Sequence, residues 1–271
     1  MKKERADVLL VSRGLAETRE LAKRLIMAGL VRLGDTTLDK AGEKVSVDAV
    51  LSVTGPVHPY ASRGGLKLQR ALEVFGVSLS DRVVLDVGAS TGGFTDCALQ
   101  HGAALVYSVD VGYGQLAWKL RTDPRVRVME RMNFRHAEVD VFDPRPDAAV
   151  MDVSFISISK LLPKLGQILL PGSVLVSLIK PQFEAGPKAV GKGGIVRDPE
   201  THARVLEQVL TQVAAAGFAI HGLTHSPIRG GEGNIEFLLW ASAPSEGTES
   251  VSAVTQVDIA ATVATAHGQL Q

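Results

Sequence analysis

The sequence has a single cysteine, no excess of either charge and no long apolar run. Cys97 alone cannot form an intramolecular disulfide or a zinc site of several cysteines, which is typical of a reducing compartment. A membrane-spanning helix needs about 20 apolar residues, and the best stretch, 165–179, is shorter and interrupted by Pro171 and Gly172. The apolar segment near the N-terminus is too short for a secretory signal. We therefore expect a soluble, cytoplasmic protein that does not bind a membrane.

The composition indicates a folded chain with one large domain or two unequal ones. Of the 271 residues, 45% are hydrophobic, 21% are charged and only 12 are proline, so the chain can bury a sizeable core. The 29 basic and 29 acidic residues balance, but residues 1–82 carry 14 basic and 10 acidic side chains. This positive excess lies in the front part of the chain, which would be the first part to contact a polyanion. A solvated charged surface explains the excess equally well.

Residues 2–53 predict a small α+β domain. Apolar spacing predicts two short helices, the first ending at Gly14 and the second running from an N-cap at Thr18 to Gly29. Short alternating strands follow. The two prolines in 55–59 then predict a linker.

From residue 61 the pattern changes to alternating helices and strands, which predicts a mostly parallel sheet with helices on both faces. Strand-like apolar runs occupy 83–88, 105–112, 126–131, 147–155, 173–183, 218–226 and 235–242. The last two runs are too close together for a crossover helix, so we expect the final strand to be antiparallel. The predicted fold is a doubly wound, Rossmann-like α/β sheet preceded by the small α+β domain. The expected domains are 1–60 and 61–242, followed by a polar tail, 243–271, with a short helix near 258–266.

A glycine-rich loop follows the first strand of this pattern and leads into a helix. In the segment 86–95 (DVGASTGGFT) the glycines let a ligand approach the backbone, and the helix N-terminus supplies free N–H groups. The spacing is not the G-x-G-x-x-G of a dinucleotide-binding fold, and a tight structural turn is the alternative. An acid at the end of the next strand can accept hydrogen bonds from ribose hydroxyls. The candidate cofactor-binding residues are Asp86, Gly88, Ser90, Gly92, Gly93, Asp110 and Asn133.

Charged residues also stand at the ends of apolar runs, where open parallel sheets bind their ligands. Asp152 and Lys180 lie in the fourth and fifth runs, and Glu236 enters the last one. A lysine closing an apolar run is unusual because burial disfavours an ammonium, and a snorkelling side chain is the alternative. Lys67 lies four residues after Arg63 on one side of a predicted helix, where a solvated face is an equal alternative.

Six motifs, taken in their order along the chain, resemble those of the TlyA/hemolysin A family. The resemblance is carried by SRGGLK (62–67), DVGASTGGFT (86–95), DVGYGQL (110–116), DVSFIS (152–157), KPQFE (180–184) and GNIE (233–236). It covers about residues 2–240 and implies a methyltransferase domain of the FtsJ/RrmJ class after an αL RNA-binding module. The activity that it implies is S-adenosylmethionine-dependent 2′-O-ribose methylation of ribosomal RNA or ribosomal subunits. The near-balanced charge of the front region departs from plain αL sequences.

By the same resemblance, Lys67, Asp152, Lys180 and Glu236 match a Lys-Asp-Lys-Glu catalytic set. A ribose hydroxyl is a poor nucleophile near neutral pH, so a base must take its proton as it attacks the sulfonium methyl. A lysine is a base only when deprotonated, which burial and a second ammonium favour and nearby carboxylates oppose. We assign Lys180 as the base, Lys67 as its electrostatic partner and ribose positioner, and the two acids as orienting groups. No metal is expected, because no cluster of ligands has metal-binding spacing.

Basic residues of the second helix and of the segment after the linker are the candidate RNA contacts, with a solvated charged helix as the alternative. They are Arg19, Lys23, Arg24 and Arg63. Three other functions compete with the methyltransferase prediction. A dehydrogenase would need the dinucleotide glycine spacing, and a hemolysin would need membrane-compatible segments. A non-enzymatic RNA-binding protein with a degenerate cofactor pocket remains open.

Overall fold

The computed structural model describes residues 3–16, 18–27, 29–54, 58–191, 193–230, 233–245 and 257–270. The chain divides into two compact units, Met1–Pro59 and Tyr60–Gln271. Residues 55–57 of the predicted linker and 246–256 of the predicted tail lie outside the described residues.

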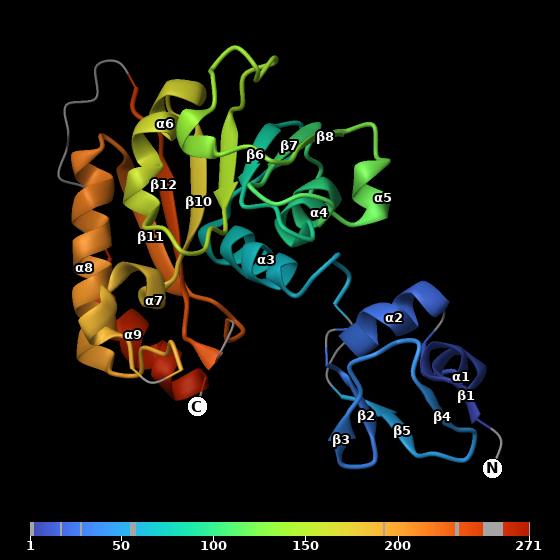
Figure 1. The fold of residues 1–271 in the computed structure, drawn as a ribbon. Coiled ribbons are helices and arrows are strands. Elements are labelled where there is room, and N and C mark those ends of the chain that lie inside the picture. Colours follow the sequence, from blue (N-terminus) through green and yellow to red (C-terminus); the bar gives the residue numbers. More distant parts are fainter. Residues whose placement is uncertain are drawn as a thin grey trace. The chain divides into compact units, whose positions relative to one another are not determined.

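The first unit packs two helices with short antiparallel strands (Figure 1). Leu10 and Ile26 are fully buried in its own apolar core. As predicted, Thr18 accepts a hydrogen bond from the backbone N–H of Leu21, at 3.1 Å, where the second helix begins. The elements are β1 (Lys3–Arg5), α1 (Ala6–Ser12), α2 (Arg19–Met27), β2 (Val31–Leu33), β3 (Thr36–Thr37), β4 (Lys44–Ser46) and β5 (Leu51–Val53). β1 was not predicted, because its three charged residues show no apolar alternation.

The second unit is built on a seven-stranded sheet with the order β11-β12-β10-β9-β6-β7-β8. The strands are β6 (Val83–Val87), β7 (Leu105–Val109), β8 (Val126–Met129), β9 (Ala148–Met151), β10 (Val174–Ile179), β11 (Ala219–His225) and β12 (Phe237–Ser242). β12 runs antiparallel to both of its neighbours, whereas the pairs from β10 to β8 are parallel. The prediction of a mostly parallel sheet with an antiparallel last strand is confirmed.

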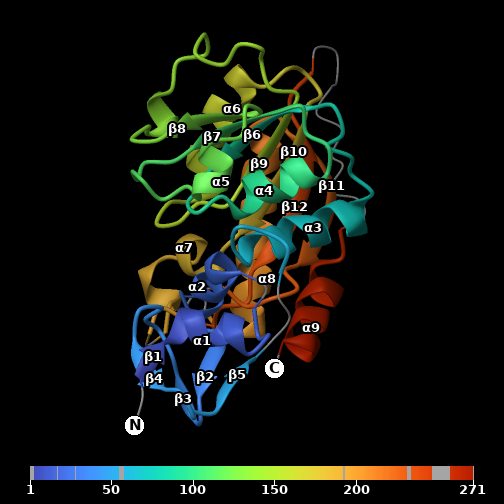
Figure 2. The ribbon, with the colours of Figure 1, turned by 90° about the vertical axis from the view of Figure 1, so that its right-hand side faces the viewer.

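Helices cover both faces of this sheet. In Figure 1, α8 and α9 lie on one side of the strands and α3, α4 and α5 on the other, and Figure 2 brings the second side forward. Each face has its own buried apolar cluster, so the sheet is a central layer between two cores. The helices are α3 (Gly64–Phe75), α4 (Gly93–Gln100), α5 (Trp118–Arg121), α6 (Leu162–Ile168), α7 (Pro181–Glu184), α8 (Pro199–Ala215) and α9 (Ile259–Gln269). Single 3₁₀ turns are η1 (Phe134–His136), η2 (Ile158–Lys160) and η3 (Pro187–Ala189).

Two strands end earlier than their apolar runs predict. β9 stops at Met151, and the chain then turns through Phe155, whose φ of 64° is incompatible with an extended strand. β10 stops at Ile179, because Pro181 has no N–H for the ladder and instead occupies the first turn of α7. Asp152 and Lys180 are therefore the first residues beyond their strands, at the edge where parallel sheets bind ligands.

The predicted C-terminal helix is present as α9 and belongs to the second unit. Asp258 caps it by accepting a hydrogen bond from the Ala261 N–H at 2.8 Å. Val263 and Ala266 are buried in the core that also contains the apolar side of α8. The described part of the predicted polar tail therefore contributes to the fold of the sheet domain.

Candidate active site

Four charged residues from separate elements converge at one edge of the sheet. Asp152 and Lys180 follow β9 and β10, Lys67 lies in α3, and Glu236 immediately precedes β12. Because β12 is antiparallel, its beginning lies at the edge where the parallel strands end. The first residue of β12 pairs with the last residue of β10, which brings Glu236 next to Lys180 along the edge.

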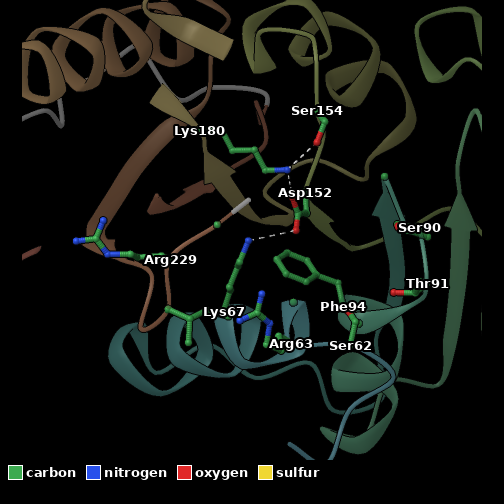
Figure 3. Close-up of a pocket in the computed structure, with 16 residues that line it drawn as sticks. Ser62, Arg63, Lys67, Ser90, Thr91, Phe94, Asp152, Ser154, Lys180 and Arg229 are labelled. Atoms are coloured by element: carbon green, nitrogen blue, oxygen red, sulfur yellow. Dashed lines mark hydrogen bonds and ion pairs between the residues drawn. The ribbon is translucent and has the colours of Figure 1, made fainter. Parts of the chain in front are cut away.

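Their charges alternate along a chain of contacts. Lys180 Nζ lies 2.5 Å from Asp152 Oδ1 and donates a hydrogen bond of 2.9 Å to Ser154 Oγ. Lys67 Nζ lies 2.5 Å from Glu236 Oε2 and 3.9 Å from Asp152 Oδ2. Figure 3 shows the two lysines approaching Asp152 from opposite sides. Two cations and two anions therefore compensate one another, as buried charges require.

Accessibility divides this set into an inner and an outer pair. The side chains of Glu236 and Lys67 are 1% and 9% exposed, and those of Lys180 and Asp152 are 12% and 20% exposed. The solvated-face alternative is wrong for Lys67, although Arg63, one turn earlier, is exposed. Lys180 and Asp152 are consequently the pair that a ligand reaches first.

A cavity of about 310 Å³, the first cavity, opens onto this set. Its walls are Ser62, Arg63, Gly64, Lys67, Gly88, Ala89, Ser90, Thr91, Gly93, Phe94, Asp152, Ser154, Lys180, Ile228, Arg229 and Gly230. Arg63 and Arg229 are exposed at this cavity. Arg229 was not predicted, because an isolated arginine in a loop carries no periodic or spacing signal.

A second cavity of about 320 Å³ lies at the ends of β6 and β7. It shares Gly88, Ser90, Asp152 and Ser154 with the first cavity. Its other walls are Val87, Val109, Asp110, Val111, Gln115, Met132, Asn133, Val153, Phe134, Phe155, Ile156 and Leu161. The two cavities therefore adjoin, and the Lys-Asp-Lys-Glu set touches both through Asp152.

The glycine-rich loop forms part of the wall between them, and its glycines are sterically required. Gly88 has a φ of 87°, and a Cβ there would lie 2.5 Å from the carbonyl oxygen of Asp152. A Cβ on Gly93 would lie 2.3 Å from Ser62 Oγ. Gly92 lines neither cavity, and a Cβ there would meet Leu120 at 2.2 Å. The structural-turn alternative therefore accounts for Gly92, whereas Gly88 and Gly93 are exposed to the cavities.

Two of the other predicted cofactor residues line the second cavity. The carboxylate of Asp110 accepts hydrogen bonds of 2.7 Å from the backbone N–H groups of Ser90 and Gly112. Each carboxylate oxygen keeps a further lone pair that can accept a ligand hydroxyl. Asn133 uses its side-chain oxygen to cap η1 through the Arg135 N–H, at 3.2 Å, and its amide group remains a donor.

Asp86 lies beneath the glycine-rich loop and lines neither cavity. It is fully buried, and Thr95 Oγ1 donates a hydrogen bond of 2.6 Å to its Oδ2 while lying 2.8 Å from Ser108 Oγ. Burial raises the pKa of Asp86 to about 7. Any effect of Asp86 on a ligand would therefore pass through the loop above it.

In the first unit, two of the three predicted RNA-contacting residues of α2 have acidic partners. Arg19 lies 3.1 Å from Asp7, a fully buried acid that also binds Arg5 at 2.9 Å. The hydrogen bond from Arg5 is the main reason that the pKa of Asp7 falls to about 2. Lys23 lies 2.9 Å from Glu20, whereas Arg24 is exposed. The positive surface of α2 is weaker than its three cations suggest.

Residues 60–243 match the family model described as FtsJ-like methyltransferase. The chain belongs to this family. Residues 4–51 match the S4 domain. The match to the FtsJ-like family and the likeness to TlyA proteins confirm the predicted family resemblance and the assignment as a methyltransferase.

The methyltransferase has relatives along its whole length. YqxC of Bacillus subtilis (strain 168) is 56% identical over 271 residues, which are 100% of this chain and 96% of YqxC. The 16S/23S rRNA (cytidine-2′-O)-methyltransferase TlyA of Mycobacterium tuberculosis (strain ATCC 25618 / H37Rv) is 44% identical over 240 residues, 88% and 90% of the two chains. A solved structure from Streptococcus thermophilus, which carries a hemolysin name, has 49% identity and a TM-score of 0.75, covering 99% of this chain and 97% of its own. No helix in the described part of this methyltransferase has the length and apolar character needed to span a membrane.

Proposed function

We propose that this methyltransferase transfers a methyl group from S-adenosylmethionine to a ribose 2′-hydroxyl of ribosomal RNA in the cytoplasm. The observation that carries the proposal is the chain of contacts Lys180–Asp152–Lys67–Glu236, in which Asp152 lines both of two adjoining cavities. One cavity can then hold the methyl donor and the other the acceptor nucleotide. The M. tuberculosis relative is named as a 2′-O-methyltransferase of ribosomal RNA, which supports this choice of acceptor.

The second cavity suits S-adenosylmethionine, which supplies a methyl group activated by a positively charged sulfur. Asp110 offers carboxylate lone pairs for the ribose hydroxyls, and Asn133 offers an amide donor. Val111 and Met132 add apolar wall against which a flat ring can pack. A side chain at Gly88 would be too close to the Asp152 carbonyl, so only glycine fits where the loop lies against Asp152 beside both cavities.

The outer pair of the Lys-Asp-Lys-Glu set is placed to meet the acceptor hydroxyl. Lys180 takes the role of general base: once neutral, its Nζ accepts the 2′-hydroxyl proton as the oxygen takes the methyl group. Asp152 at 2.5 Å fixes the position of Nζ, and Ser154 holds it from the other side at 2.9 Å. Alignment of the hydroxyl with the methyl group supplies much of the rate of an in-line displacement.

The inner pair positions the outer pair. Glu236 is almost fully buried and holds Lys67 at 2.5 Å, so that Lys67 stands 3.9 Å from Asp152. Lys67 thereby places a second positive charge beside the carboxylate that contacts Lys180. Lys67 also lines the first cavity, where its ammonium can donate a hydrogen bond to the ribose.

The S4 domain is proposed to anchor the RNA. In this division of labour residues 1–60 bind the RNA through Arg19, Lys23 and Arg24, and residues 61–242 bind the cofactor and catalyse the transfer. Arg63 contributes from the rim of the first cavity, where it is exposed. Within 243–271, the described helix α9 packs on the sheet domain.

The test compares Lys180→Ala with Lys164→Ala, a lysine of α6 that lines neither cavity. With ribosomal subunits that lack the modification, Lys180→Ala should abolish methyl transfer and bind S-adenosylmethionine as the wild type does in calorimetry. Lys164→Ala should retain both properties. RNA with a 2′-deoxy nucleotide at the mapped target should be inert, and methylation of that RNA by the wild type would refute a ribose acceptor.

A further inference from the structure

A third cavity, here termed the cationic hollow, lies beside the first cavity and has a volume of about 320 Å³. Three basic side chains line it, Arg197 from the loop before α8, Arg229 from the loop before β12, and His267 from α9. Both arginines are exposed and form no ion pair with another described residue. By contrast, both lysines of the Lys-Asp-Lys-Glu set are already compensated by carboxylates.

A buried amide holds the two arginine-bearing loops together. Asn234, 1% exposed, accepts a hydrogen bond from the Val196 N–H and donates one to the Gly194 carbonyl, both at 3.0 Å. The position of Arg197 is therefore tied to the loop that carries Arg229. This arrangement also gives a physical role to an asparagine that the sequence showed only as part of the GNIE motif.

Arg229 is fixed at a second point. Its Nη1 donates a hydrogen bond of 2.7 Å to the Gly233 carbonyl, and its Nη2 donates to the carbonyl of Leu270 at the end of α9. Because a guanidinium has five N–H donors, three remain for a ligand. Its head group points away from Lys180 and Asp152, as Figure 3 shows. Arg229 thus lines both the first cavity and the cationic hollow.

His267 is hydrogen-bonded to a buried histidine of α8. His202 Nδ1 lies 2.8 Å from His267 Nε2. Burial lowers the pKa of His202 to about 4, so it is neutral near pH 7. The contact with α8 therefore fixes the His267 ring in the wall of the cationic hollow.

We propose that the cationic hollow binds a phosphodiester group of the RNA strand whose target nucleotide occupies the first cavity. This inference rests on the proposed function, since it needs an RNA acceptor. Two planar guanidinium groups beside a histidine suit phosphate oxygens. Arg229 lines both cavities, so a strand that runs from the first cavity into the hollow would pass beside it. The hollow would fix the strand next to the target nucleotide without contacting the reacting atoms.

The experiment measures binding of unmodified ribosomal subunits at a series of salt concentrations by full-length Arg197→Gln. Arg197 is chosen because no hydrogen bond or ion pair of its side chain with another described residue would be broken. One lost phosphate contact should reduce the slope of log affinity against log salt by about 0.7–1 unit and weaken binding about tenfold at low salt. KM for subunits should rise, while the single-turnover rate at saturating subunits and the affinity for S-adenosylmethionine stay unchanged.

Two further variants serve as controls. Arg204→Gln removes the same charge from an exposed position of α8 that does not line the hollow, and it should retain the wild-type slope. Arg197→Lys keeps the charge and should largely restore the slope while losing the planar geometry.

An unchanged slope in Arg197→Gln, or an equal loss in Arg204→Gln, would overturn the proposal. If Arg197→Gln weakens binding of inorganic phosphate and leaves the subunit slope unchanged, the hollow is a small-anion site and the RNA assignment is wrong. Because these measurements report binding, they stay informative about the hollow. Failure of the wild type to methylate any RNA would separately refute the proposed function.

Discussion

Two acidic residues near the cavities are buried in different ways. Glu236 has the ammonium of Lys67 at 2.5 Å and forms an ion pair. Asp86 has no cation beside it and accepts a hydrogen bond from the hydroxyl of Thr95, while its Oδ1 has no hydrogen-bond partner among the described residues. Desolvation is therefore the largest influence on Asp86, and its pKa rises to about 7.

The raised pKa of Asp86 predicts a specific dependence of stability on pH. The unfolded chain releases this proton near pH 4, whereas the folded protein keeps it until about pH 7. The stabilising contribution is complete below pH 4 and is lost as the pH rises through 7, up to about 4 kcal/mol in all. Urea unfolding at pH 5 and pH 8 should show that Asp86→Asn, which resembles the protonated acid, lacks this loss. The same decrease in both proteins would show that Asp86 is not its source.

The position of Asp110 in the second cavity predicts that its substitution weakens binding of the cofactor. Asp110→Ala removes the acceptor of ribose hydroxyls and of two loop N–H groups, at about 1.5–3 kcal/mol for each charge-assisted hydrogen bond. Calorimetry should show S-adenosylmethionine bound at least tenfold more weakly. Asp140→Ala, an exposed acid outside the second cavity, is the matched control. Equal affinities for the two variants would remove Asp110 from the cofactor site.

At the scale of elements, replacing a helical glycine by alanine should have opposite effects on stability at Gly65 and at Gly166. Gly65 lies in α3, and a Cβ there would come within 2.3 Å of the buried Tyr60 ring. Gly166 lies in α6, where the nearest atoms would be 3.9 Å away. Alanine favours a helix over glycine by about 1 kcal/mol, but overpacking costs about 1–3 kcal/mol.

Gly166→Ala should therefore raise the midpoint of thermal unfolding, and Gly65→Ala should lower it. Both variants can be compared with the wild type by circular dichroism. A rise for Gly65→Ala would mean that Tyr60 moves aside without loss, and that the start of α3 is less tightly packed than its contacts indicate.

The approximate positions and the directions of the strands could be predicted from the sequence, because apolar runs and their separation reflect the sheet directly, whereas the order of the strands in the sheet was not predicted. The ends of β9 and β10 could not, since a turn at Phe155 and a helix at Pro181 interrupt runs that stay apolar. The four residues of the Lys-Asp-Lys-Glu set could be found from the sequence, because they stand at the ends of apolar runs or match a motif of the family. Arg197 and Arg229 did not, because only the folded loops bring them together.

At the scale of the whole molecule, each of the two units has its own apolar core. The chain truncated before Tyr60, which keeps this buried residue with the sheet domain, should therefore fold and bind S-adenosylmethionine with unchanged affinity. It should methylate intact subunits poorly at physiological salt, because the proposed RNA anchor is absent. The full-length protein with Arg19, Lys23 and Arg24 changed to glutamine should show a milder form of the same defect. Full efficiency of the truncated protein would refute an anchoring role of the S4 domain.

The reversed direction of β12 has a consequence for the time at which activity can arise during synthesis. Residues 60–180 already contain three members of the Lys-Asp-Lys-Glu set and the walls of the second cavity. Glu236 enters the set only when β12 inserts between β10 and β11. A nascent chain still attached to the ribosome can thus form a pocket for the methyl donor while Lys67 lacks its closest counter-ion. Under the proposed function, methylation would begin only once the final strand is in place, so an incomplete polypeptide would not modify the ribosome that is making it.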